Sequence, residues 1–179
     1  VARRYLCEGD HIADVTVGGG SFWRKVDLGA YRFYAYDAYC CSALPFDATR
    51  QPYVDESMDV VALDPPRSAY PMASTRKARE FLSGRVPAST ANPPALALCL
   101  TAMDEACRVL RPGGLLWVKC RDTSGSNRQY MEHIAVHNYA LDVLGLSVED
   151  LFIQVSTTDA GPNWHRPAPK NHRYLWVFR

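Results

Sequence analysis

The chain has 179 residues, of which 47% are hydrophobic and 22% charged, and its 20 Lys and Arg residues nearly balance 19 Asp and Glu residues. This length and composition predict one globular domain over residues 1–179 and exclude a disordered or low-complexity chain. No apolar run approaches the roughly 18 residues that span a bilayer, so we expect no membrane partner. The net charge of +1 excludes a uniformly basic nucleic-acid-binding surface but leaves room for a local basic patch.

The six cysteines are scattered through the chain and form no Cys-x-x-Cys pair. This spacing argues against a zinc ribbon or a dithiol redox motif. Most of them stand in apolar stretches, which is typical of buried, reduced thiols. We therefore expect a cytoplasmic protein with free cysteines and no metal.

The N-terminal half of the chain alternates short apolar runs with turns. Residues 11–17 form a β-branched run that stops at the glycines 18–20, and 31–36 (YRFYAY) is rich in aromatic residues, so both predict strands. A brief helix is expected between them at 21–28, with its first serine as a candidate N-cap. The apolar run 58–63 (MDVVAL) predicts a buried strand.

The longest helical pattern lies in the second half. Leu, Ala and Met residues recur at helical spacing over 94–110, and a Pro-Gly-Gly turn at 111–114 separates this helix from an apolar strand at 115–120. A second helix is predicted over 129–144, ending before a glycine.

The order of these elements predicts the fold class. Strands that alternate with helices indicate an α/β fold, here a Rossmann-like, doubly wound and mostly parallel sheet. The last two predicted strands, 147–156 and 174–178, are joined by a polar, Pro-rich stretch rather than by a helix. That connection predicts a C-terminal antiparallel hairpin at the edge of the sheet.

A glycine turn follows the first predicted strand, in the sequence DVTVGGG from Asp14 to Gly20. Glycine lets the backbone approach a ligand closely, and such turns lie at the sheet edge where α/β folds bind ligands. The motif is not the dinucleotide fingerprint, because Trp23 stands where that pattern needs glycine. The next strand ends at Asp37, which could accept hydrogen bonds from a ribose diol. Taken alone, the glycine motif could equally be a plain turn, and Asp37 could be a solvated carboxylate at a strand end.

The most specific motif is Asp64-Pro65-Pro66, directly after the predicted strand 58–63. Proline cannot continue a strand, so the turn is rigid. Such a turn can accept both hydrogens of an amino group, one on Asp64 and one on the Pro65 carbonyl. The nitrogen lone pair would then point at a methyl donor, a preorganisation worth about 3 kcal/mol per acceptor. A purely structural, strand-ending turn is the alternative.

These motifs, in this order, resemble class I S-adenosylmethionine (SAM)-dependent methyltransferases. Asp64-Pro65-Pro66 resembles the D/N/S-P-P-Y/F/W motif of bacterial and phage enzymes that methylate adenine N6 or cytosine N4, and the segments VLRPGG, LLWVKC and KNHRYLWVF extend the resemblance over nearly the whole chain. The resemblance implies SAM as the cofactor and Asp64, Pro65 and Pro66 as the catalytic turn. The cofactor-binding residues that it implies are Asp14, Thr16, Gly18, Gly20, Asp37 on the ribose and, beside the adenine, Leu44, Pro45 and Phe46.

Three features depart from the pattern of that family. Arg67 replaces the aromatic residue that stacks on the target base; its guanidinium plane can also stack, and Tyr70 is a second candidate. The stretch 37–44 is too short for the usual helix and third strand. We expect no separate target-recognition domain within these 179 residues, so sequence-specific DNA methylation by this chain alone is not expected, and a partner subunit could supply target recognition.

Further candidates lie in the C-terminal half. Trp164, Arg166 and Lys170 could contact nucleic acid through stacking and phosphate pairing, with an ordinary surface loop as the alternative. Lys119 and Asp122 follow the central strand and face the expected cleft, but the sequence assigns them no role.

The sequence therefore predicts a methyltransferase that moves a methyl group from SAM to an exocyclic amine, with adenine or cytosine in DNA as the first-choice substrate. RNA and small-molecule amines are alternatives. A catalytically silent, methyltransferase-like binding subunit is the alternative from another class; Arg67 and the altered loop around Cys40 favour it, and the intact Asp64-Pro65-Pro66 turn disfavours it. The enzyme interpretation requires that the glycine turn and the proline turn meet at neighbouring strand ends.

Overall fold

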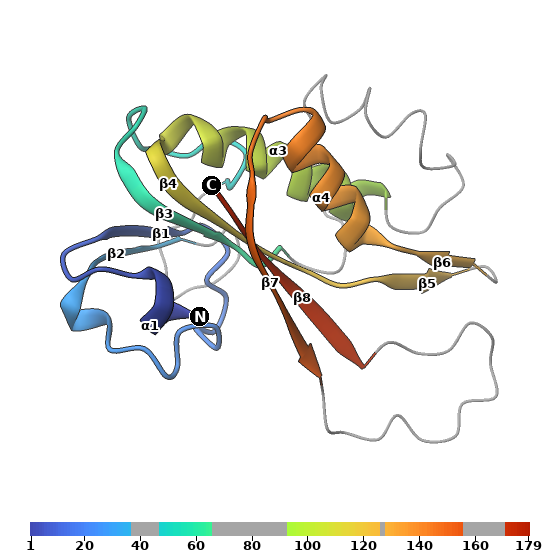
Figure 1. Cartoon of the computed structure of the whole chain (residues 1–179), viewed down its shortest axis with the longest axis horizontal. Coiled ribbons are helices and arrows are strands. Elements are labelled where there is room, and N and C mark those ends of the chain that lie inside the picture. The colour runs from blue at the N-terminus through green and yellow to red at the C-terminus, as the bar shows by residue number, and fades with distance from the viewer. Residues whose placement is uncertain (37–46, 66–92, 126–127, 156–170) are drawn as a thin grey trace.

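The computed structural model describes residues 1–36, 47–65, 93–125, 128–155 and 171–179. Its centre is a six-stranded sheet in the order β2-β1-β3-β4-β8-β7 (Figure 1). The strands are β1 (His11–Asp14), β2 (Arg32–Ala35), β3 (Met58–Leu63), β4 (Leu110–Cys120), β7 (Val148–Val155) and β8 (His172–Phe178). Strands β2, β1, β3 and β4 are parallel, and β8 runs antiparallel to both β4 and β7. The predicted fold class, including the C-terminal antiparallel hairpin, is confirmed.

Both faces of the sheet are covered, by different means. Helices α3 (Pro93–Val109) and α4 (Glu132–Asp142) lie on one face (Figure 1). The other face carries the short helix α1 (Ala2–Tyr5) and the turns that lead to the 3-10 helix Leu28–Ala30. The core under α3 and α4 includes Leu100, Met103, Leu116 and Tyr139, and the core on the opposite face includes Ile12, Trp23, Trp117 and Val177. None of the described helices is long and apolar enough to cross a membrane.

Two predictions near the N-terminus are corrected. Strand β1 ends at Asp14 and not at residue 17, because the Asp14 carboxylate accepts the backbone N–H of Thr16 at 2.9 Å and turns the chain. The helix predicted at 21–28 is absent: this segment forms turns, and the 3-10 helix follows it. The indole of Trp23 donates to Asp14 at 2.6 Å and stacks on Trp117, so long-range contacts decide the path of this segment.

The remaining boundaries follow the apolar pattern closely. Strand β3 has the predicted bounds, and α3 is shifted by one residue from the prediction. The turn predicted at 111–114 is a bulge inside β4: Leu110 pairs with Met58, whereas Leu115 pairs with Val60. The helix predicted at 129–144 starts only at Glu132, because the residues before it form the hairpin of β5 (Thr123–Gly125) and β6 (Arg128–Tyr130). The four cysteines in the described part of the chain are free thiols.

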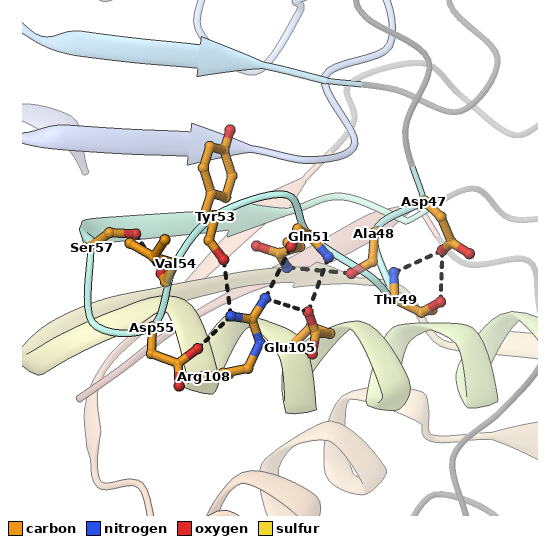
Figure 2. A network of polar contacts seen from close by, with 10 residues as sticks. All are labelled: Asp47, Ala48, Thr49, Gln51, Tyr53, Val54, Asp55, Ser57, Glu105 and Arg108. Atoms are coloured by element: carbon orange, nitrogen blue, oxygen red, sulfur yellow. Dashed lines mark hydrogen bonds and ion pairs between the residues drawn. The ribbon is translucent and has the colours of Figure 1, made fainter.

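Arg108 on α3 holds the segment that enters β3 (Figure 2). Its guanidinium donates to the backbone carbonyls of Tyr53 and Gln51 at 2.9 and 3.0 Å. It also donates to the carboxylates of Asp55 and Glu105 at 2.6 and 2.8 Å. Glu105 in turn accepts the backbone N–H of Gln51 at 3.0 Å. One side chain therefore fixes the entry to the strand that carries the proline turn.

Replacing Arg108 with methionine is expected to lower the free energy of unfolding by about 2–3 kcal/mol, because two carbonyls and the half-buried Glu105 lose their donor. Hydrogen bonds from Arg108 lower the pKa of Glu105. The part of the stabilisation that comes from the Arg108–Glu105 pair is therefore fully present above about pH 4.5, the ordinary pKa of a glutamate, and is lost as the pH falls below it. Urea unfolding of both proteins at several pH values checks this, and the difference between them should narrow in acid. Arg111→Met is the control, since its single ion pair with Asp59 is exposed and should contribute less than about 1 kcal/mol.

Candidate active site

The glycine turn and the proline turn meet at the same edge of the sheet. Strands β1 and β3 are adjacent and parallel, with Asp14 in register with Ala62. Past the ends of both strands, the backbone N–H of Asp64 donates to the hydroxyl of Thr16 at 2.6 Å. The juxtaposition that the enzyme interpretation requires is therefore present.

Asp14 anchors the glycine turn from inside the protein. Its side chain is 2% exposed and accepts hydrogen bonds from the Trp23 indole and the Thr16 backbone. Burial raises the pKa of Asp14 to about 6, helped by the charge of Asp64, while the hydrogen bonds from Trp23 and Thr16 lower it. Both oxygens of the carboxylate receive protein donors. The contact with a cofactor that the resemblance implies for Asp14 remains a prediction.

The turn itself has the backbone that glycine permits. Gly18 and Gly20 have φ angles of +51° and +69°, which side chains with a Cβ rarely adopt. A Cβ added at Gly19 or Gly20 would meet no described atom within 4 Å, so none of the described residues packs against the turn at these positions. The Gly20 N–H closes the turn on the Val17 carbonyl at 2.8 Å. This is a surface on which a flat or extended ligand can approach the main chain closely.

Asp64 pairs with a lysine to which the sequence assigned no role. The Asp64 side chain is 36% exposed, and one of its oxygens accepts a hydrogen bond from the Lys119 ammonium. The Lys119 side chain is 10% exposed and lies on β4, where Val118 is in register with Leu63. Its ammonium also lies 5.6 Å from the centre of the Phe22 ring. The only signal for this pair in the sequence is that the two residues end neighbouring parallel strands.

A second polar cluster follows the end of β4. Asp122 is 4% exposed and binds His133 Nδ1 at 2.6 Å. The imidazole of His133 stacks on Tyr174 with ring centres 4.0 Å apart. The Tyr174 hydroxyl contacts His172 Nε2 at 2.9 Å, and burial is the main cause that raises the pKa of Tyr174. These contacts join α4 to β8 at the edge of the sheet that carries the proline turn.

Most of the other sequence candidates fall outside the described residues. Pro65 is described and half-buried after Asp64. The candidates outside the described part of the chain are Pro66, Arg67, Tyr70, Asp37, Leu44, Pro45, Phe46, Trp164, Arg166 and Lys170. Among the described residues, the site therefore consists of the glycine turn, the Asp64-Pro65 turn and Lys119.

No family model and no curated protein matches this chain. Among solved structures, it is similar to a SAM-dependent methyltransferase from Methanosarcina mazei, with a TM-score of 0.59, 12% identity, and coverage of 98% of this chain and 94% of that one. A proposed rRNA methylase from Clostridium thermocellum matches with a TM-score of 0.52, 14% identity, and coverage of 98% and 91%. A SAM-dependent methyltransferase from Aquifex aeolicus matches with a TM-score of 0.51, 15% identity, and coverage of 98% and 85%. The chain therefore shares the Rossmann-like α/β fold of these methyltransferases.

Proposed function

We propose that this protein is a SAM-dependent methyltransferase that acts on an exocyclic amine, with adenine or cytosine in DNA as the first-choice substrate. The observation that carries the proposal is the hydrogen bond between the Asp64 N–H and Thr16, which joins the proposed cofactor loop to the proposed amine-binding turn. The fold shared with the Methanosarcina mazei and Aquifex aeolicus methyltransferases supports it. RNA is the next substrate candidate, in keeping with the rRNA methylase named for the Clostridium thermocellum protein.

The described residues suit SAM. The described residues leave room for a ligand beside Gly19 and Gly20, and Thr16 and Gly18 lie in the same turn. When bound, SAM supplies an electrophilic methyl group on a sulfonium, so neither a metal nor a covalent enzyme intermediate is needed. A target base inside a duplex would first have to be flipped out of the stack.

The protein's own contribution is made at the proline turn. Lys119 engages one oxygen of Asp64, which leaves the other oxygen of the partly exposed carboxylate for an amine hydrogen. The Pro65 carbonyl would accept the second hydrogen. Both acceptors would hold the nitrogen so that its lone pair is directed away from the turn. The product nitrogen must then lose a proton, which water can receive because Asp64 is not fully buried.

Cofactor binding can be tested through the Thr16 contact. A saturating concentration of SAM, about 100 times its Kd, should stabilise the protein by about 2.7 kcal/mol. For a domain of this size the Tm should rise by about 5–10 °C. Thr16→Val keeps the shape of the side chain but removes the acceptor for the Asp64 N–H, so the SAM-induced shift should shrink markedly.

Thr49→Val is the matched control. Thr49 makes the same local pattern with Asp47, through its N–H at 2.8 Å and its hydroxyl at 2.7 Å, but in the segment that enters β3. Its SAM-induced shift should equal that of the wild type. If Thr16→Val and Thr49→Val show the same SAM-induced rise in Tm, Thr16 does not contribute to cofactor binding. If the wild type shows no rise, SAM is not its cofactor.

One observation favours a second candidate, a methyltransferase-like subunit that binds without catalysis. The pairing of Asp64 with Lys119 occupies part of the carboxylate that an amine would need. This candidate predicts SAM or nucleic-acid binding without methyl transfer, including in the presence of a partner subunit. Transfer of a labelled methyl group to DNA or RNA by the chain would eliminate it.

A further inference from the structure

A groove that shares only Lys119 with the proposed chemistry lies on the face of the sheet opposite α3 and α4. It has a volume of about 780 Å³ and is bounded by α1, the turn segment 21–26 and parts of β4, β7 and β8. Volumes of roughly 300–1,000 Å³ are usual for ligand sites. The groove is large enough for more than a solvent molecule, and its lining shows which chemistry it suits.

The lining is basic, although the whole chain is nearly neutral. It contains five Lys or Arg residues and no Asp or Glu. Arg3, Arg24 and Lys25 are exposed and Arg173 is half-buried. Within the part of the chain that the structure describes, none of these four side chains forms an ion pair, and Asp150 on β7 is engaged by Tyr5. Cations that meet no counter-charge among the described residues, gathered on one groove, favour an anionic ligand.

Aromatic rings lie between these cations. Phe22 and Phe152 line the groove and are half-buried, while Trp23 and Trp117 are buried behind them and stack with ring centres 5.7 Å apart. The Trp117 indole nitrogen is buried and meets no hydrogen-bond partner among the described residues. Cations that track phosphates and rings that receive bases are the combination by which proteins bind single-stranded nucleic acid. A duplex would offer phosphates but would keep its bases away from the rings.

Lys119 connects this groove to the proposed reaction site. It lines the groove and its ammonium binds the Asp64 carboxylate. We propose that the groove binds a single-stranded stretch of nucleic acid, with phosphates on Arg3, Arg24, Lys25 and Arg173 and bases against the aromatic lining. This inference rests on the proposed function, because the groove would hold the nucleotides next to the target base while that base reaches Asp64.

Binding can be measured without cofactor or methyl transfer, by fluorescence anisotropy of a labelled oligothymidylate, its oligouridylate counterpart and a blunt DNA duplex. The first two separate DNA from RNA. Arg24→Gln/Lys25→Gln should weaken binding of the preferred single strand by at least about tenfold. If each residue neutralises one phosphate, the slope of log K against log salt should become less steep by about 1.4, at roughly 0.7 per phosphate. Arg32→Gln/Arg50→Gln removes the same charge from exposed residues outside the groove and should bind as the wild type does.

The aromatic contribution has a separate signature. Phe152→Leu should weaken single-strand binding by about fivefold or more without changing the salt slope, because a stacking contact involves no counterion. Equal binding by the two double variants, or a wild-type affinity for the duplex that matches that for single strands, would overturn the inference.

Failure of the groove assignment can be told apart from failure of the proposed function. If the wild type transfers no methyl group to any polymer, while Arg24→Gln/Lys25→Gln still loses binding, the proposed function fails and the groove assignment stands. If the wild type transfers methyl groups and the double variant binds single strands unchanged, the proposed function stands and the groove assignment fails.

Discussion

Asp64→Ala is expected to slow methyl transfer at least about 100-fold and to leave the SAM-induced rise in Tm unchanged. The alanine removes the acceptor that holds one amine hydrogen, a loss of about 3 kcal/mol in the transition state. The cofactor loop keeps its tie, because the Asp64 backbone N–H that donates to Thr16 is unaffected by the side chain. The measurement is transfer of a labelled methyl group from SAM to single-stranded DNA, duplex DNA and RNA, with Tm recorded for each protein.

Asp64→Asn is the matched variant for this experiment. Its amide keeps one oxygen acceptor and nearly the same shape, so its rate should fall between those of the wild type and Asp64→Ala. An alanine variant as fast as the wild type would remove Asp64 from the reaction. A wild type that binds SAM but transfers nothing to any of the polymers would favour the silent subunit.

Lys119→Met is expected to reduce kcat by about tenfold or more while KM changes little. Lys119 orients the carboxylate of Asp64, which lies close enough to the buried Asp14 for the two charges to interact. Without the ammonium, the Asp64 carboxylate loses the contact that orients it, so a bound amine would be held less well for transfer. Because the Asp64 side chain is 36% exposed and water can solvate it once unpaired, the variant should destabilise the fold by only about 1 kcal/mol.

The double variant Lys119→Met/Asp64→Ala separates positioning from a general structural effect. If Lys119 acts through Asp64, its replacement should change the rate little once Asp64 is alanine, so the two effects are strongly non-additive. Additive losses in the double variant would mean that Lys119 serves only the stability of the fold. Tm values of all four proteins show whether the folded fraction accounts for any change in rate.

Short-range sequence patterns correctly predicted the elements whose conformation depends mainly on residues nearby in the chain. The continuous apolar run gave β3 its predicted bounds, and helical spacing located α3 to within one residue. The segment 21–28 was predicted wrongly, because its conformation depends on Trp23 reaching Asp14 and stacking on Trp117. Trp117 lies on β4, far along the chain, and no propensity of the segment itself reveals that contact.

The candidate site, too, has features that the sequence predicts and features that depend on long-range contacts. The motifs placed the glycine turn and Asp64 at one sheet edge, because parallel neighbouring strands end together. The Lys119 partner of Asp64 could not be derived, since strand order brings the two residues near each other but side-chain rotamers decide whether they pair. The basic lining of the groove could not be predicted from the sequence either, because it is formed by three separate segments that contribute Arg3, Arg24, Lys25 and Arg173.

The position of β8 has a consequence for how the protein is made. This strand, His172–Phe178, lies between β4 and β7 and hydrogen-bonds to both. While the chain is being synthesised, β4 therefore presents an unsatisfied edge until residues 172–178 have left the ribosome. The sheet therefore cannot be completed until β8 has been synthesised. Until then, the exposed edge of β4 can be bound by chaperones or can pair with the wrong strand.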